Sequence, residues 1–104
     1  MKRFAFKMKL MPGNKFEYAS RHGAIWPELK ALLSKSGVRD YTIHFDEETN
    51  TLFGFQKQEG ESSSQDLGSN PMVQDWWKYM ADIMETNSDN STVSITLEEL
   101  FHMD

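Results

Sequence analysis

One stretch of the sequence decides the fold: residues 38–58, which read VRDYTIHFDEETNTLFGFQKQ. Alternate residues in its first half are apolar, and a period of two is typical of a β-strand with one buried face. These apolar residues are Tyr41, Ile43 and Phe45. Residues 46–50 are polar turn material, and the extended pattern then resumes. The stretch therefore predicts a β-hairpin with strands at 38–46 and 51–58.

Two further alternating segments predict the remaining strands. Residues 2–10 place Phe, Phe, Met and Leu on one face and mostly charged side chains on the other. Residues 93–97 alternate Val, Ile and Leu with Ser and Thr. Both patterns have the period of a half-buried strand, and Pro12-Gly13-Asn14 ends the first strand as a turn.

Helices are predicted on either side of the hairpin. Asn14 is placed to cap a helix that follows it, and Pro27 suits the first residue of a second helical stretch that Gly37 would stop. Residues 70–84 begin with Asn-Pro and carry apolar side chains at helical spacing. The Ser- and Gly-rich residues 60–69 fit either a loop or a frayed helix.

The order of these elements is β-α-β-β-α-β. This order predicts an α+β fold of the ferredoxin-like type, an antiparallel sheet with helices on one face. A length of 104 residues suits one domain, residues 1–104. No helix is left to cover the other sheet face, and the chain is rich in Trp, Phe and Met. We therefore expect a homodimer, a dimeric α+β barrel in which a second copy covers that face.

Composition and charge exclude several classes of function. The net charge of −5 argues against binding to the nucleic-acid backbone. The sequence has no cysteine, which excludes a thiol nucleophile or a cysteine-based zinc site and fits a cytoplasmic protein. It has no apolar run that would form a signal peptide or a membrane span. It also has no phosphate loop, nucleophile elbow or dinucleotide fingerprint. We expect no nucleic-acid or membrane partner.

Tyr18 and His22 are the first candidate site residues. They lie four residues apart in a predicted helix, so they share one face of it. Gly23 and Pro27 interrupt the helix just beyond them, which makes a pocket there reasonable. Histidine is the side chain most readily tuned to exchange a proton near neutral pH. The same spacing also fits a surface pair without a function.

Three further aromatic residues are candidates. Trp76 and Trp77 are adjacent, and neighbouring helical side chains point about 100° apart. We expect one to pack inward and the other to lie at a helix edge, where its ring could stack on a sugar. Tyr41 would want a partner for its hydroxyl if buried, and a core role stays open for all three. His44 and His102 lack the spacing of metal ligands, so no metal site is expected.

Four separated blocks of the sequence match one known family in the same order. They are Tyr18-x-x-Arg21-His22 running into Ile25-Trp26-Pro27-Glu28-Leu29, Tyr41-x-Ile43 followed by Phe45-Asp46, Trp76-Trp77-Lys78-Tyr79-Met80-Ala81-Asp82-Ile83-Met84, and Asp89-Asn90-Ser91 with the tail Leu97-Glu98-Glu99-Leu100-Phe101. With these blocks the sequence resembles the L-rhamnose mutarotase family over essentially its whole length.

The resemblance implies a dimeric isomerase that interconverts the α and β anomers of L-rhamnose or a related deoxy sugar. It implies His22 as the catalytic proton donor, Tyr18 and Tyr41 as sugar-contacting tyrosines, and Trp76 and Trp77 as sugar-contacting tryptophans. The helix and strand spacings described above had indicated the same five residues as candidates. Positioned acid–base catalysis supplies about 10²–10⁴-fold in rate, so neither a metal nor an organic cofactor is needed.

Two other functions are compatible with the fold. A cofactor-free dimeric α+β barrel oxygenase would share it, but the polar set Tyr18, His22 and Tyr41 counts against the apolar pocket that such an enzyme needs. A non-catalytic sugar-binding domain would use the same residues as the mutarotase, so the sequence leaves that function open.

Overall fold

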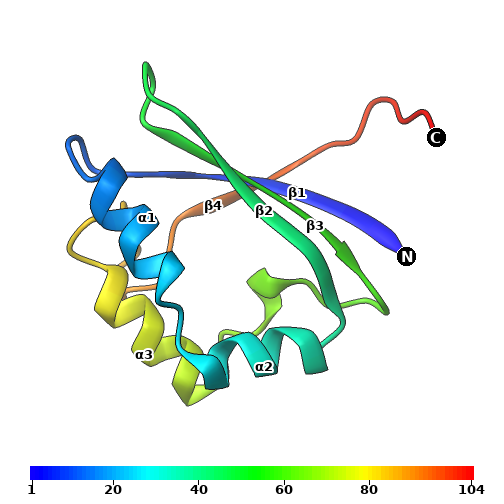
Figure 1. Cartoon of the computed structure of the whole chain (residues 1–104), viewed down its shortest axis with the longest axis horizontal. Helices are drawn as coiled ribbons and strands as arrows, with labels where there is room; N and C mark the ends of the chain where they lie inside the picture. Colours follow the sequence, from blue (N-terminus) through cyan, green and yellow to red (C-terminus); the bar gives the residue numbers. More distant parts are fainter.

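The computed structural model describes residues 1–104, and Figure 1 shows their arrangement. The strands are β1 (Lys2–Lys9), β2 (Val38–Asp46), β3 (Thr51–Gln58) and β4 (Ser94–Leu97). The helices are α1 (Lys15–Gly23), α2 (Pro27–Lys35) and α3 (Pro71–Met80), and a short 3₁₀ helix, η1 (Ser64–Asp66), precedes α3. The predicted β-α-β-β-α-β order is confirmed, with the first helical region divided into α1 and α2.

The four strands form one sheet in the order β2-β3-β1-β4, and every neighbouring pair is antiparallel. The helices lie on one face of this sheet, and the chain beyond β4 runs away from the sheet edge (Figure 1). The predicted α+β class, with helices on one face of an antiparallel sheet, is therefore confirmed. None of the helices combines the length and apolar character that crossing a lipid bilayer requires.

The core lies between the sheet and the helices. Phe6 is fully buried at its centre and is opposite Gly54 in the pairing of β1 with β3. A Cβ atom at position 54 would collide with the Phe6 ring, so the glycine lets this ring lie flat on the sheet. From the helix side α3 adds Val73, Trp76 and Met80, all of them buried.

The helix ends differ from the predicted ones at two places. The side chain of Asn14 makes no capping bond to α1, because its amide donates to the carbonyls of Met11 and Pro12 in the preceding turn. The prediction of a helix reaching Met84 was wrong, since α3 ends at Met80 and Met84 pairs with Leu10 in an isolated β-bridge. The apolar residues after Met80 are buried, although they lie beyond the end of the helix.

Other helix signals are confirmed. Asn70 caps α3, its side-chain oxygen accepting a hydrogen bond from the Met72 N–H at 2.9 Å. Pro27 is in the first turn of α2, and Gly37 follows the end of α2 with a φ of +94°. Because that φ lies in the left-handed region, glycine is favoured at the position.

Candidate active site

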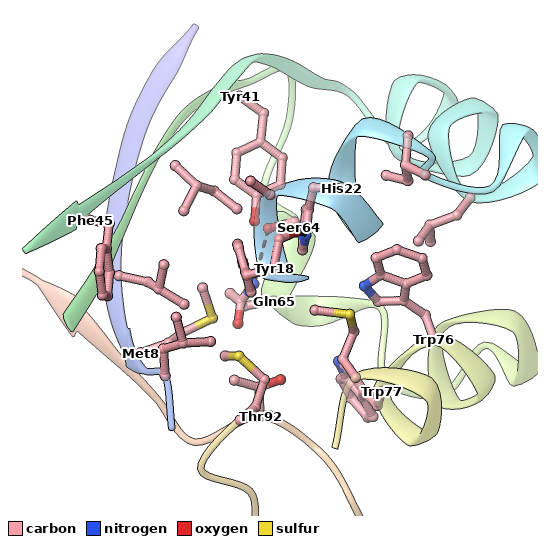
Figure 2. A pocket seen from close by; sticks show the side chains of 18 of the residues that line it. Met8, Tyr18, His22, Tyr41, Phe45, Ser64, Gln65, Trp76, Trp77 and Thr92 are labelled. Carbon is pink, nitrogen blue, oxygen red and sulfur yellow. Dashed lines mark hydrogen bonds between the residues drawn. The ribbon is translucent and has the colours of Figure 1, made fainter. Parts of the chain in front are cut away.

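A cavity of about 490 Å³ lies on the helix-covered side of the sheet. Cavities of roughly 300–1,000 Å³ are typical of sites for small molecules. Most of its lining is apolar, and all five site residues predicted from the sequence belong to it (Figure 2). The polar and aromatic side chains that reach it beyond these five are Lys15, Phe45, Ser64, Gln65 and Thr92.

One side of the cavity, the helix wall, consists of Tyr18 and His22 from α1 and Trp76 and Trp77 from α3. The Tyr18 and His22 rings stack with centroids 4.1 Å apart, as the shared helix face predicted. The edge of Trp76 meets the His22 ring at 5.4 Å. His22 is therefore held between two aromatic neighbours by packing.

The hydrogen bonding of His22 defines which ring nitrogen carries the proton. Its Nδ1 lies 3.2 Å from the Tyr18 carbonyl oxygen. A carbonyl oxygen only accepts, so Nδ1 carries the hydrogen and Nε2 keeps a free lone pair. Burial lowers the pKa of His22 below its ordinary value of 6.5, with the bond to the Tyr18 carbonyl acting in the opposite sense. At neutral pH His22 is therefore a neutral proton acceptor.

The two tryptophans have different surroundings. Trp76 is 9 % exposed and packs edge-on against Trp26 at 5.0 Å. Trp77 is half-buried, and both rings reach the cavity. A Cβ atom on Gly68 would lie 2.7 Å from the Trp77 ring, so the glycine makes room for this ring at the cavity wall. Sequence reasoning missed Gly68, because the contact joins two separate segments.

Arg21 fastens α1 to the end of α3. Its two terminal nitrogens donate to the two oxygens of Asp82 at 2.8 and 3.1 Å, and its Nε donates to Glu17 at 2.9 Å. The guanidinium also donates to the Tyr79 carbonyl at 2.8 Å and lies 4.8 Å from the Tyr79 ring. Arg21 directly precedes His22, so this clasp fixes the helix that carries His22.

A second part of the cavity lining, the sheet wall, consists of Tyr41 from β2 and of Ser64 and Gln65 from η1. Tyr41 lies at a β-bulge. The register of β2 on β3 shifts between Arg39 and Thr42, so that Asp40 and Tyr41 together oppose Gln56. A φ of +48° at Asp40 accommodates the extra residue. Tyr41 shares the inward face of Ile43 and Phe45, and the extra residue lets Val38, on the other side of the bulge, point inward as well.

Both tyrosine phenols are protonated at neutral pH. Burial raises the pKa of Tyr41 to about 12, while a hydrogen bond with the Ser64 side chain acts to lower it. Burial raises the pKa of Tyr18 further, and the neighbouring Tyr41 adds to that rise. The cavity thus joins one neutral imidazole acceptor with two phenol donors.

Sequence reasoning missed Ser64 and Gln65. Residues 60–69 are a loop with one 3₁₀ turn, and this turn is held by a capping box between Ser63 and Asp66. The signal that could have found it is the Ser-x-x-Asp spacing, which is a capping signature. Nothing in the sequence indicates that this turn faces the cavity.

The remaining histidines lie away from the cavity. His44 meets the Phe55 ring edge-on at 5.6 Å on the open face of the sheet, and His102 pairs with Asp104 in the C-terminal tail. No three His, Cys, Asp or Glu side chains gather into a group that could hold a metal ion.

Comparison with known proteins identifies the family. The family model described as L-rhamnose mutarotase matches residues 3–103. The chain belongs to the L-rhamnose mutarotase family. It is 69 % identical to an L-rhamnose mutarotase of Bacteroides thetaiotaomicron and 64 % identical to one of Phocaeicola vulgatus, each over 104 residues and the full length of both chains. The resemblance seen in the sequence is therefore confirmed.

Solved structures agree with this membership. The crystal structure of an L-rhamnose mutarotase from Formosa agariphila matches this fold with a TM-score of 0.93 at 56 % identity, covering all of both chains. A structure from Mycobacterium tuberculosis matches with a TM-score of 0.52 at 14 % identity, and shares the fold alone. The family fold is thus found at high similarity in one solved mutarotase.

Proposed function

We propose that the protein is an isomerase, a mutarotase that interconverts the α and β anomers of L-rhamnose. One observation carries the proposal. An unprotonated His22 Nε2 and protonated tyrosine phenols line the same cavity in a member of this family. Acid/base-assisted opening and closure of the sugar ring requires one acceptor and one donor, and both are present.

The reaction balances with these groups alone. His22 Nε2 takes the proton of the anomeric hydroxyl while a phenol gives a proton to the ring oxygen. The bond between the anomeric carbon and the ring oxygen breaks, its electron pair goes to that oxygen, and an open-chain aldehyde forms. After rotation about the adjacent carbon–carbon bond, the ring closes on the other face with the two proton transfers reversed.

This cycle gives His22 both roles in sequence. The sequence resemblance implies a proton donor at this position, and the neutral imidazole must first accept a proton before it can donate one. His22 therefore acts as a base when the ring opens and as an acid when it closes. Such positioned proton transfers contribute about 10²–10⁴-fold in rate, or about 3–5.5 kcal/mol.

The lining of the cavity suits a deoxy sugar. A 6-deoxy sugar carries a methyl group where other hexoses carry a hydroxymethyl group, and Met8, Leu10 and Met84 offer that methyl an apolar surface. Tyr18, Tyr41, Trp76 and Trp77 are the proposed sugar contacts. The flat faces of Trp76 and Trp77 suit the apolar C–H face of a pyranose ring.

Saturation-transfer NMR of the anomeric protons tests the proposal. With the protein present, saturation of the α signal of L-rhamnose should pass to the β signal much faster than in buffer. L-mannose, which adds only the 6-hydroxyl, should exchange more slowly, and L-fucose tests the stereochemistry of the ring. Line broadening of the sugar without faster exchange would favour a non-catalytic sugar-binding domain instead.

A homodimer through the open sheet face is part of the proposal. Phe55 and Ile95 on that face are 44 % and 55 % exposed, and Leu100 in the tail is 87 % exposed. Exposed apolar side chains of this kind favour a second copy as their cover. Light scattering at micromolar concentration should give the mass of a dimer, and a stable monomer would contradict this part of the proposal.

A cytoplasmic location completes the proposal. The cysteine-free sequence supports it, because disulfides are characteristic of oxidising compartments. Cell fractionation with an antibody against the protein would test the assignment, and recovery in the periplasmic fraction would overturn it.

A further inference from the structure

Lys15 is the only lysine or arginine in the lining of the cavity, and no aspartate or glutamate joins it there. It is the first residue of α1, and its side chain is 47 % exposed, so it lies where the cavity meets solvent. An ammonium group is a hydrogen-bond donor with no acceptor. This end of the cavity is therefore attractive to the oxygen atoms of a ligand.

The donors of the Lys15 ammonium are not used within the chain. Its Nζ lies 3.6 Å from Glu47 Oε2 in the turn between β2 and β3, which is an ion pair but is too long for a hydrogen bond. The same Nζ lies 5.3 Å from the centre of the Phe16 ring, within the range of a cation–π contact. All three N–H groups of the ammonium can therefore donate to a ligand.

Lys15 shares one face of α1 with Tyr18 and His22. The three residues follow one another at spacings of three and four, and each of them lines the cavity. From Lys15 to His22 the helix rises about 10 Å, at roughly 1.5 Å per residue. Hydrogen bonds of about 3 Å at both ends leave room for one pyranose ring between the two side chains. The helix thus presents a polar stripe along which a sugar can lie.

We infer that Lys15 is a substrate-binding residue that recognises the sugar hydroxyl on the far side of the ring from the anomeric carbon. The inference rests on the proposed function, which places the anomeric hydroxyl at His22 Nε2. Ring carbon 4 is opposite the anomeric carbon, so the Lys15 ammonium donates to the oxygen of the 4-hydroxyl. Lys15 holds the ring and takes no part in proton transfer, since its cation has no lone pair to accept a proton.

This contact divides the sugar between two kinds of surface. The hydroxyls lie along the polar stripe of α1, and the apolar side chains of Met8, Leu10 and Met84 are left for the 6-methyl group. A hydrogen bond from a charged donor is strong and directional, whereas burial of a methyl group has no preferred direction. Lys15 therefore fixes which way round the ring lies against His22.

Substitution of Lys15 in the full-length protein tests the inference. Lys15→Met keeps the length of the side chain and removes its charge and its donors. It should raise KM for L-rhamnose about 10-fold, within the usual effect of one hydrogen bond to a charged group. It should change kcat little, because the 4-hydroxyl is bound equally before and during the reaction. Lys30→Met is the matched control and should change neither constant, since Lys30 is exposed on α2 and does not line the cavity.

The sugar supplies the second arm of this test. 4-Deoxy-L-rhamnose lacks the hydroxyl assigned to Lys15, so Lys15→Met should have no effect on KM for this sugar. 2-Deoxy-L-rhamnose keeps the 4-hydroxyl and should still show a rise of about 10-fold. An equal rise with both deoxy sugars would overturn the inference, because the lost contact would not involve the 4-hydroxyl.

Glu47 separates sugar binding from the ion pair. A role of Lys15 through this ion pair alone would make Glu47→Gln raise KM as much as Lys15→Met does, and that result would overturn the inference. We expect instead an unchanged or lower KM for Glu47→Gln, because the ammonium loses a competing partner and keeps its donors for the sugar.

Binding measured without turnover keeps the inference distinct from the proposed function. Tryptophan fluorescence reports on sugar in the cavity, since Trp76 and Trp77 line it. Lys15→Met should weaken the binding of L-rhamnose about 10-fold, and unchanged binding would overturn the inference even in an active enzyme. A wild-type protein that binds L-rhamnose without exchanging its anomers would refute the proposed function and leave the Lys15 contact in place. A wild-type protein that does not bind L-rhamnose would overturn both.

Discussion

The two walls of the cavity are built by different forces. On the helix wall, ring stacking and burial hold His22 and keep it neutral, with one backbone carbonyl selecting its tautomer. On the sheet wall, directed hydrogen bonds from Gln56 to Ser64 hold the 3₁₀ turn that lines the cavity together with Tyr41. Packing thus orients His22, the proposed proton acceptor, and hydrogen bonding orders the wall that carries Tyr41, a proposed donor, so we expect that each wall can be altered without the other.

Removal of the acceptor should have the largest effect. His22→Ala should lower the rate of anomer exchange about 10²–10⁴-fold, because the acid–base term is lost. The free energy of unfolding should change by about 1 kcal/mol or less, since His22 is only partly buried and lies at the wall of the cavity. Anomer-exchange NMR and thermal melting measure the two quantities.

His44→Ala is the matched control for this variant, because His44 lies on the open face of the sheet, away from the cavity. It should keep the wild-type rate. If His22→Ala exchanged anomers at nearly the wild-type rate, or if it unfolded, His22 would be a structural residue and the helix wall would not supply the acceptor.

Substitution of the two tryptophans separates packing from sugar binding within the helix wall. Trp76→Ala should cost about 3–5 kcal/mol in unfolding free energy, the usual range for a buried Trp. Trp77→Ala should cost less, because Trp77 is half-buried, and should mainly raise KM. Chemical denaturation and saturation curves measure these effects. Equal losses of stability in the two variants would contradict the assignment of Trp76 mainly to packing and of Trp77 mainly to sugar binding.

Loosening the Arg21 clasp should have a smaller effect. Arg21→Ala should lower the unfolding free energy by about 1 kcal/mol, since its carboxylate partners Glu17 and Asp82 are more than half exposed, although the bidentate geometry puts the pair at the upper end of the range for surface ion pairs. It should lower the exchange rate several-fold, because α1 is then less firmly held. Arg21→Lys should recover little, as a lysine cannot form the bidentate bond with Asp82.

Arg39→Ala is the control for the clasp. Arg39 is a partly exposed arginine that forms an ion pair with Glu59 at 3.6 Å, and it does not line the cavity. If Arg39→Ala reduced exchange as much as Arg21→Ala does, the loss would reflect general destabilisation, and the clasp would have no special part in placing His22.

The helix wall could be predicted from the sequence because its geometry is local. Tyr18 and His22 meet through a spacing of four residues in one helix, and Trp76 and Trp77 follow from the apolar pattern of another. The alternation of the strands and the order of the elements were likewise enough to predict the ferredoxin-like fold.

The sheet wall could be predicted only in part. Tyr41 was found through its alternation with Ile43, but the β-bulge at this position depends on pairing with β3. Ser64 was missed because its bonds to Gln56 join a strand to a loop that has no periodicity. The end of α3 was misplaced for a related reason, since the apolar residues after it are buried by tertiary contacts.

The pH dependence of anomer exchange tests the central claim most directly. Burial lowers the pKa of His22 below 6.5, so the neutral acceptor persists as the pH falls through that value. After subtraction of the buffer rate, kcat/KM should be level at neutral and mildly alkaline pH and should fall at acidic pH with its midpoint below about pH 6.5, as His22 gains a proton. The residual rate of His22→Ala should lack this fall. A wild-type rate that instead decreased as the pH rose through 6.5 would show that the imidazolium is the working form, and would contradict the account.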